Sequence, residues 1–372
     1  MGSIGSIGSI GSIGSIGSIG SIGGLGSIGS IGSIGSIGGL PVAGLGGFGG
    51  DAPASGALAA GITSSLYAVA DLDPVAAATS AQQMTPGAAN LDRYAVWVRA
   101  SLYVSDVLRD LDWTPLGQSP DEWTLNCRQA GGPARVATLR KPPMSMFVSQ
   151  LRYMRDYRDQ RADRAVEVLT QPGMPADYFA CILGLTGARH AHVLELMLAT
   201  QVLAAHAAMI AKHHFACRRP DTLDPTLMPM IPTPGHNAYP SAHAAEAFAV
   251  ATVLSQLVAD RPGWFPDPAR AATLLRRQAE RIAVNRTVAG MHFPLDSWAG
   301  AMLGQAVARM LLARCKGASE LRAWTYDPQD VDFSLEALEE AWASQSADAA
   351  DAVSFAASPL AWLWSKASDE LS

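Results

Sequence analysis

The sequence predicts an all-α protein whose helices pack in bundles behind a low-complexity N-terminal tail. Two observations lead to this prediction. Of the 372 residues, 49% are hydrophobic and only 16% are charged, so the chain has enough apolar side chains for a sizeable core. From residue 91 onward, apolar residues recur at the spacing of three to four that places them on one face of a helix. Helices of this kind bury their apolar faces against one another.

The tail comprises residues 1–50. Residues 2–40 form thirteen triplets that begin with glycine, eleven of them GSI and two GGL. A period of three fits neither the period of two of a strand nor the 3.6 residues per turn of an α-helix. We therefore expect a disordered tail, and a self-associating segment is the alternative. Residues 51–90 are rich in alanine and are expected to link the tail to the folded part.

Two predicted helices flank a loop region. Residues 91–112 place apolar side chains on one helical face, and residues 145–170 begin at Ser145, a favourable N-cap. Between them, residues 113–143 contain prolines and glycines that interrupt the helical period. This region predicts loops, with one or two short strands near residues 133–139.

The other predicted helices follow in order along the chain. They cover residues 174–187, 189–217, 241–259, 267–288, 295–314 and 334–345. We assign residues 91–316 to a helical catalytic domain and residues 317–372 to a C-terminal helical extension. Arginines and aspartates alternate through residues 152–164, which predicts a solvent-exposed helix face with intrahelical ion pairs.

Charge and hydropathy exclude several classes of protein. The net charge of −6 argues against a general nucleic-acid binder. Apolar stretches such as residues 247–259 are shorter than the roughly 20 residues that span a bilayer, so we expect no transmembrane span. No basic segment followed by an apolar one opens the chain, so we expect no signal peptide and a cytoplasmic location. Homo-oligomer formation is left open.

Residues 212–220, KHHFACRRP, concentrate basic side chains in an otherwise acidic chain. Lys212 and Arg219 are seven residues apart, which is two helical turns, so they share one face. Pro220 disfavours the α conformation at the preceding residue and therefore places Arg219 at the end of the helix. The helix dipole alone explains cations near that end. It does not explain Lys212, which lies two turns earlier.

A second segment, AYPSAHAAEAF at residues 238–248, begins a helix. Ser241 is a favourable N-cap, and the alanines that follow are strong helix formers. The free backbone N–H groups of a helix N-terminus bind oxyanions. His243 would lie in the first turn, close to such an anion. Taken alone, a serine in this position is more often a simple cap.

A third segment, NRTVAGMHFPLD at residues 285–296, supplies a cation and a histidine. Arg286 ends one predicted helix, and His292 lies in the connection to the next. Asp296 follows four residues later and is able to hold one imidazole nitrogen, which leaves the other as a nucleophile or ligand. A structural His–Asp pair is the alternative for this pair in isolation.

Together, the three segments predict a pocket for a tetrahedral or trigonal-bipyramidal oxyanion. Three cations, a helix N-terminus and two histidines are the groups that such an anion requires. A zinc site is disfavoured because the chain has no His-Glu-x-x-His motif and because clustered cations repel a metal ion. No nucleophile elbow surrounds Ser241, and no phosphate-binding P-loop motif is found.

The order and spacing of these residues resemble the type 2 phosphatidic acid phosphatase and vanadium-dependent haloperoxidase superfamily over about residues 200–310. The resemblance implies an all-α bundle of that type. It also implies that the equatorial oxygens of phosphate or vanadate are held by Lys212, Arg219, Ser241, the Ala242 amide and Arg286. His292 would bond to phosphorus or vanadium and would be oriented by Asp296. His243 would be the acid–base group at the opposite apical position.

This chain departs from the family at two positions that bear on the site. Ala242 stands where the family usually has glycine, so the backbone there has to be helical already for the amide to serve. Asn285 replaces the usual serine before Arg286. A third residue, His236, lies five positions before Ser241, where bromide-oxidising members of the family carry histidine.

The resemblance implies two reactions. The first is oxidation of halide, bromide rather than chloride, by hydrogen peroxide at a vanadate cofactor bound to His292. The second is hydrolysis of phosphate monoesters through a phosphohistidine, with no cofactor. The segment HNAYPSAHA favours the haloperoxidase, whereas CRRP is closer to the acid phosphatases. A non-catalytic oxyanion-binding or assembly protein is the third alternative.

Overall fold

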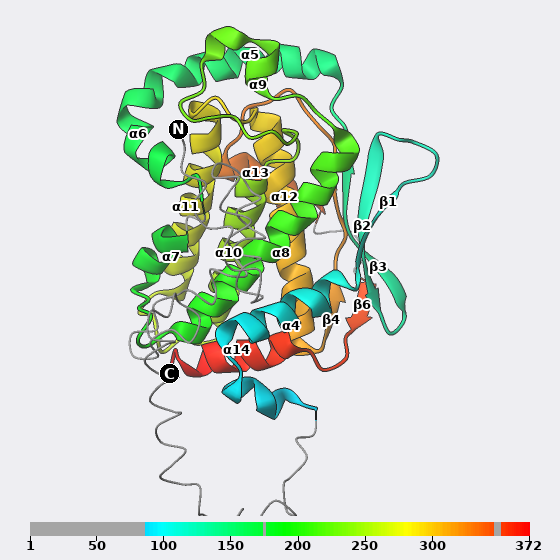
Figure 1. Cartoon of the computed structure of the whole chain (residues 1–372), viewed down its shortest axis with the longest axis vertical. Helices are drawn as coiled ribbons and strands as arrows, with labels where there is room; N and C mark the ends of the chain where they lie inside the picture. Colours follow the sequence, from blue (N-terminus) through cyan, green and yellow to red (C-terminus); the bar gives the residue numbers. More distant parts are fainter. Residues whose placement is uncertain (1–85, 174–175, 346–350) are drawn as a thin grey trace, which may run out of the picture.

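Four long helices lie side by side at the centre of the computed structural model, which describes residues 86–173, 176–345 and 351–372 (Figure 1). They are α8 (Ala191–Phe215), α10 (Ala242–Ala259), α11 (Pro268–Val288) and α12 (Pro294–Lys316). Helix α10 is the central member, because it packs against each of the other three. Thirteen of its 18 residues are buried, which fits a mostly apolar helix with neighbours on several sides.

The backbones of α10 and α12 approach closely where α12 carries two glycines. A Cβ atom placed on Gly300 would lie 2.3 Å from the carbonyl oxygen of Ser241. One placed on Gly304 would lie 2.1 Å from the carbonyl oxygen of Ala245. Both distances are far below van der Waals contact, so only glycine allows this approach. The N-terminus of α10 is therefore fixed directly against α12.

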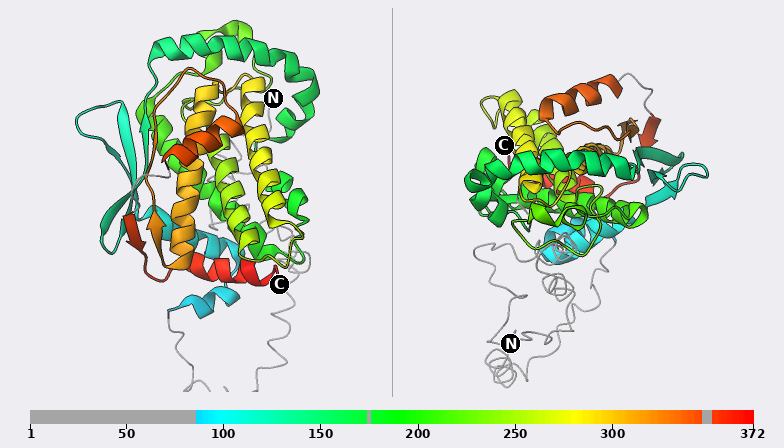
Figure 2. Two further views of the ribbon diagram at one scale, coloured as in Figure 1. Left: turned by 180° about the vertical axis from the view of Figure 1, so that it is seen from behind. Right: turned by 90° about the horizontal axis from the view of Figure 1, so that it is seen from above.

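Shorter helices cover the two ends of the central helices (Figures 1 and 2). One end lies under α5 (Met144–Asp156), the 3-10 helix η3 (Tyr157–Gln160), α6 (Arg161–Thr170) and α9 (Pro220–Leu223). The other end is covered by α4 (Val96–Leu108) and α14 (Pro359–Asp369). The remaining helices are α7 (Ala176–Leu183), α13 (Leu335–Gln345) and the 3-10 helices η2 (Ala88–Arg93) and η4 (Pro225–Leu227).

The prediction of a mostly helical fold is confirmed, but the all-α prediction is wrong because two small sheets are present. The larger has the order β1-β2-β3-β5 and the smaller pairs β4 with β6. The strands are β1 (Leu111–Pro115), β2 (Glu122–Gln129), β3 (Gly132–Arg140), β4 (Ala318–Leu321), β5 (Trp324–Tyr326) and β6 (Asp351–Ser354). The indole N–H of Trp113 donates to the carbonyl of Ala207 in α8 at 3.1 Å, which joins the sheet to the bundle.

Helix ends depart from the sequence prediction in two regions. The helix predicted from residue 91 begins as η2 and becomes α-helical only at Val96. The helix predicted for residues 145–170 is divided by η3 into α5 and α6, and its N-cap is Pro143 rather than Ser145. The C-terminal part, residues 317–372, contains strands as well as helices. Tertiary packing decides these ends, because local propensity differs little between a helix and a tight turn.

The arginine-rich run in α5 and α6 does not form the predicted intrahelical ion pairs. Arg152 pairs with Asp330, and Arg155 pairs with Asp224. Arg161 donates to the carbonyl oxygens of Leu227, Met228 and Val288. These arginines therefore attach α5 and α6 to other elements of the structure.

The expectation that no segment is long and apolar enough to span a membrane is wrong. Two helical segments, Ala191–Leu223 and Ala242–Ala259, reach the required length and hydropathy. The apolar stretch 247–259 is preceded by Glu246, and α10 continues through that residue to begin at Ala242. In this fold, 78% of the most apolar window of each segment is buried. The predicted tail and linker, residues 1–85 in particular, lie outside the described residues.

Candidate functional site

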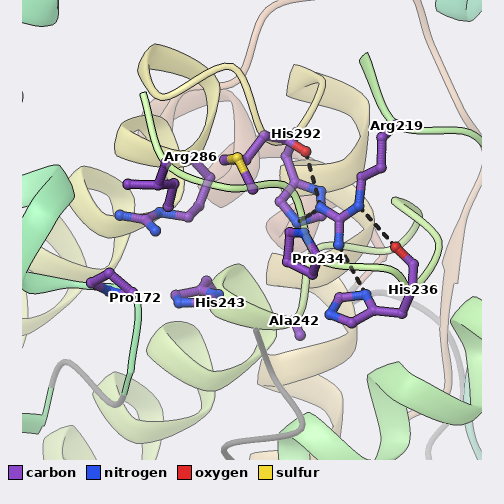
Figure 3. A pocket seen from close by; sticks show the side chains of 10 residues that line it. Pro172, Arg219, Pro234, His236, Ala242, His243, Arg286 and His292 are labelled. Atoms are coloured by element: carbon purple, nitrogen blue, oxygen red, sulfur yellow. Dashed lines mark hydrogen bonds between the residues drawn. The ribbon is translucent and has the colours of Figure 1, made fainter. Parts of the chain in front are cut away.

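A small pocket lies at the N-terminus of α10 and the last turn of α11, beside the connections that follow α6, α8, η4 and α11 (Figure 3). Its volume is about 20 Å³, which exceeds the roughly 10–15 Å³ that one water molecule needs. Ten residues line it: Pro172, Arg219, Ile231, Pro234, His236, Ala242, His243, Arg286, Met291 and His292. Six of the ten are residues that the sequence singled out. The pocket is therefore small, and polar groups from several helices converge on it.

Lys212 lies in the last turn of α8 and is 1% exposed. The helix ends at Ala216, which adopts the left-handed conformation with φ of 51°. The Lys212 ammonium donates to the carbonyl oxygens of Ala238 at 2.6 Å and of Asn237 at 3.0 Å. Burial and the charge of Arg219 lower the pKa of Lys212 well below its usual value. Lys212 does not line the pocket and instead supports the loop beside it.

Arg219 lies just after α8, in the extended conformation that Pro220 imposes. Its Nη1 atom donates to His292 Nε2 at 3.0 Å and to the carbonyl of Met291 at 3.0 Å. Its Nε and Nη2 atoms donate to the carbonyl and to Nδ1 of His236, both at 2.9 Å. Burial lowers the pKa of Arg219 to about 10, so the group remains charged at neutral pH. Arg219 thus joins two histidines in the same pocket.

Ser241 is the N-cap of α10, as the sequence predicts. Its hydroxyl accepts a hydrogen bond from the backbone N–H of Ala244 at 3.4 Å, and the serine is fully buried. Ala242 is the first residue of the helix and lines the pocket. Its φ is not positive. Alanine in place of glycine is therefore compatible with the local backbone.

His243 lies in the first turn of α10 and lines the pocket. Its Nε2 atom is 2.9 Å from the backbone carbonyl oxygen of Gln171. A carbonyl only accepts hydrogen bonds, so Nε2 carries the proton and Nδ1 has the free lone pair in the neutral ring. Burial and the charge of Arg286 lower the pKa of His243 to about 3.

Arg286 occupies the last turn of α11 and is 2% exposed. Its Nη2 atom donates to Gln171 Oε1 at 3.1 Å, whereas its Nε atom has no hydrogen-bond partner among the described residues. Burial lowers its pKa to about 10, so it also remains charged. A buried guanidinium with an unused N–H group is suited to an added acceptor.

His292 and Asp296 form a buried pair at the start of α12. His292 Nδ1 is 3.0 Å from Asp296 Oδ2, which also accepts from the backbone N–H of Phe293 at 3.0 Å. Because Arg219 donates to His292 Nε2, the ring proton lies on Nδ1 and the Nε2 lone pair faces Arg219. Burial and the charge of Arg219 lower the pKa of His292. Burial raises the pKa of Asp296 to about 7, although Lys212 opposes that shift.

The cationic side chains of this site form no direct ion pairs with other described residues, although the carboxyl group of Asp296 is near enough to raise the pKa of two of them. Within the described residues, none of Lys212, Arg219 and Arg286 forms an ion pair within 4.0 Å, although all three are buried. Burial, followed by the charges of Lys212 and Arg219, lowers the pKa of His236 to about 3. Buried charges are normally paired. The arrangement is therefore one that an oxyanion would stabilise.

Sequence reasoning missed part of the pocket. Gln171 contacts two site residues, and four apolar residues form the rim: Pro172, Ile231, Pro234 and Met291. They belong to no motif, and their positions depend on how the connections fold over the bundle. The spacing of Arg164, Glu167 and Gln171 places them along one helical face. This spacing is the feature of the sequence that could have indicated Gln171. No group of three or more His, Cys, Asp or Glu able to hold a metal ion occurs among the described residues.

A family model matches part of the chain. Residues 191–317, about a third of the chain, match the PAP2 superfamily. This stretch contains all the predicted site residues from Lys212 to Asp296, whereas α5, α6 and Gln171 precede it. No curated protein matches the chain. The superfamily match supports a phosphatase- or haloperoxidase-type function and does not distinguish the two branches.

Proposed function

We propose that the protein is a vanadium-dependent haloperoxidase that oxidises bromide with hydrogen peroxide in the pocket around His292. The observation that carries this proposal is the arrangement of Arg219. Its guanidinium touches the Nε2 lone pair of His292 on one side and His236 on the other. His236 is a neutral histidine next to the anion site, where it would contribute to halide oxidation. It has no assigned step in phosphate hydrolysis.

The residues present fit vanadate. His292 Nε2 is an unprotonated nitrogen donor, and three buried basic side chains that form no direct ion pair within the described part of the chain would balance a multiply charged oxyanion. Arg219, Arg286 and the backbone N–H of Ala242 would hold its oxygens, with Lys212 contributing charge from behind. When bound, vanadate supplies a Lewis acid that activates hydrogen peroxide toward a halide without changing its own oxidation state.

The protein's own residues would supply binding, orientation and a proton. In the overall reaction, peroxide and bromide yield hypobromous acid and water with the uptake of one proton; bromide loses two electrons and the peroxide O–O bond accepts them. We assign proton transfer to His243 Nδ1, because Nε2 is committed to the Gln171 carbonyl. A bound anion would raise the pKa of His243 toward neutrality by offsetting the charge of Arg286.

Phosphate monoester hydrolysis is the second candidate. The tautomer of His292 favours it, since a neutral ring with an unprotonated Nε2 is a nucleophile without any cofactor. Nε2 would attack phosphorus while the ester P–O bond breaks, and His243 would protonate the departing alcohol oxygen. Water would then hydrolyse the phosphohistidine. The cations would stabilise the charge of the pentacovalent transition state in both steps.

One experiment separates the two candidates. The purified full-length protein is incubated with orthovanadate, and bromination of phenol red is measured with peroxide and bromide. Hydrolysis of p-nitrophenyl phosphate is measured on the same protein without vanadate. We expect vanadate-dependent bromination that falls in a His236→Ala variant but not in a His213→Ala control, because His213 is exposed at the end of α8. Bound vanadate without bromination, together with phosphatase activity that vanadate inhibits, would establish the second candidate instead.

A further inference from the structure

Gln171 is a wholly buried residue that follows α6 and precedes Pro172 of the pocket rim. It lies outside the residues that match the superfamily. Its two polar groups reach two different helices of the site. The side-chain Oε1 atom accepts from Arg286 Nη2 at 3.1 Å, and the backbone oxygen accepts from His243 Nε2 at 2.9 Å. One residue thus contacts a cation on α11 and a histidine on α10.

The side-chain amide of Gln171 is not explained by packing. Its Nε2 atom is buried and has no hydrogen-bond partner among the described residues. Burying an unpartnered N–H group is unfavourable, and an apolar side chain of the same length would fill the space without it. What the amide adds is its oxygen, which accepts from Arg286 and also from Asn285 Nδ2 at 3.0 Å.

Gln171 is held in place by contacts along α6. Arg164 donates to Asn285 Oδ1 at 3.0 Å, and Glu167 accepts from Asn285 Nδ2 at 3.0 Å. Glu167 also pairs with Arg281 of α11. The residue next to Arg286 is therefore one of the points at which α6 attaches to α11. Asn285, with its donor and its acceptor both used, makes this attachment.

We propose that Gln171 is a positioning residue of the oxyanion site. Its side chain holds the Arg286 guanidinium in the orientation that meets the anion, and its backbone carbonyl keeps the His243 proton on Nε2. The anion-binding part of this role requires only that the pocket binds an oxyanion. The His243 part rests on the proposed function.

The first test replaces the amide and keeps the volume. Gln171→Met removes Oε1 but leaves the backbone carbonyl, and isothermal titration with orthovanadate and with inorganic phosphate measures affinity. We expect binding to weaken roughly 10- to 100-fold, as for the loss of a hydrogen bond to a charged group. The matched control is Gln150→Met. Gln150 is equally buried, but it bonds to the backbone of Leu295 and Val331 rather than to any pocket side chain.

A second readout separates positioning from a general loss of structure. If Gln171 acts through Arg286, Gln171→Met should weaken anion binding less than about threefold in an Arg286→Lys background. Because the carbonyl to His243 is retained, the pH profile of turnover should keep its shape in Gln171→Met while KM rises. An equal loss in both backgrounds would overturn the positioning role.

A further variant tests the same role if Gln171→Met does not fold. Gln171→Glu keeps the shape and an oxygen acceptor, but its carboxylate would pair with Arg286 and compete with the anion. We expect its vanadate affinity to fall at least as far as that of Gln171→Met. Wild-type affinity in a folded Gln171→Met or Gln171→Glu protein would overturn the role of Gln171. Failure of the wild-type protein to bind either anion would instead overturn the proposed function.

Discussion

The two histidines of the pocket are anchored in opposite ways. His292 is held by Asp296, four residues later in the same turn, whereas His243 is held by the backbone carbonyl of Gln171, 72 residues away. The first anchor is a charged side chain that also caps its own helix. The second is a neutral backbone group in a connection that α6 holds in place. One imidazole is therefore oriented locally and the other by tertiary packing.

This difference has a chemical consequence. A carboxylate partner favours a positively charged ring and increases the electron density of the other nitrogen, which suits a nucleophile or ligand. A carbonyl partner fixes the tautomer with much less effect on charge, which suits a group that gains and loses a proton in each turnover. The anchors therefore match the two roles that we propose for the rings.

Replacing the locally anchored histidine should give the largest effect. We expect His292→Ala to abolish turnover, because the nucleophile or ligand is lost, while the protein remains folded. Activity is measured with the bromination and phosphatase assays, and folding by circular dichroism. Full activity in a folded His292→Ala protein would show that the assignment of roles in this pocket is wrong.

Loss of the charge on the local anchor should have the next largest effect. Asp296→Asn keeps the shape but allows the wrong tautomer of His292, so we expect turnover to fall by about 10²-fold or more. His243 has no side-chain anchor and should keep its orientation in this variant. The pH dependence of kcat separates the contributions of His292 and His243 to turnover. The part of the profile assigned to His243 should persist in Asp296→Asn. Its loss would show that the two histidines are not anchored independently.

Closer packing of α12 against α10 should disturb the distant anchor. In Gly300→Ala, the added methyl group would meet the Ser241 carbonyl and push the first turn of α10, with His243, away from its position. We expect a loss of stability of about 1–3 kcal/mol or more, with reduced turnover. Gly263→Ala is the matched control, because nothing lies within 4 Å of the added atom. Equal melting temperatures for the two variants would contradict this account.

The smallest expected effect is a pH dependence of stability that both histidines share. Their pKa values in the folded protein lie below the ordinary 6.5, so the unfolded chain takes up protons first as the pH falls. The part of the unfolding free energy that depends on neutral histidines is therefore fully present above about pH 6.5. It is lost as the pH falls toward about 3. Asp296 has the opposite effect on stability, because its pKa is raised to about 7 and its protonation in the folded state is favoured on acidification. It is a single group, however, whereas three histidines have lowered pKa values: His236, His243 and His292.

Thermal unfolding with and without phosphate measures this dependence. We expect Tm to fall between about pH 6.5 and pH 4.5, and saturating phosphate to reduce the fall because the anion raises the histidine pKa values. A Tm that is unchanged or higher at acidic pH without anion would show that the pocket histidines are not held neutral.

Much of the structure was predictable from regular spacing. The boundaries of α10, α11 and α13 agree with prediction within one residue, because Ser241 and Asp267 cap α10 and α11 and all three carry a helical period. The sheet was underestimated, because β2 and β3 bury side chains irregularly along their length, with a register shift at Leu125, rather than in strict alternation. The long-range partners of the arginines in α5 and α6 are 66 to 178 residues away, so no local pattern indicates them.

By itself, the sequence predicted which groups would hold an oxyanion and where they lie relative to the helices. Those features depend on proline, on capping residues and on separations of four to seven residues, all of which are local. Only the tertiary structure decided that Lys212 supports the pocket from behind rather than lining it, and that His243 and Arg286 share Gln171. Such contacts are set by how α6 and the loops fold over the helix ends. Groups that meet across 26 to 115 residues leave no periodic signal in the chain.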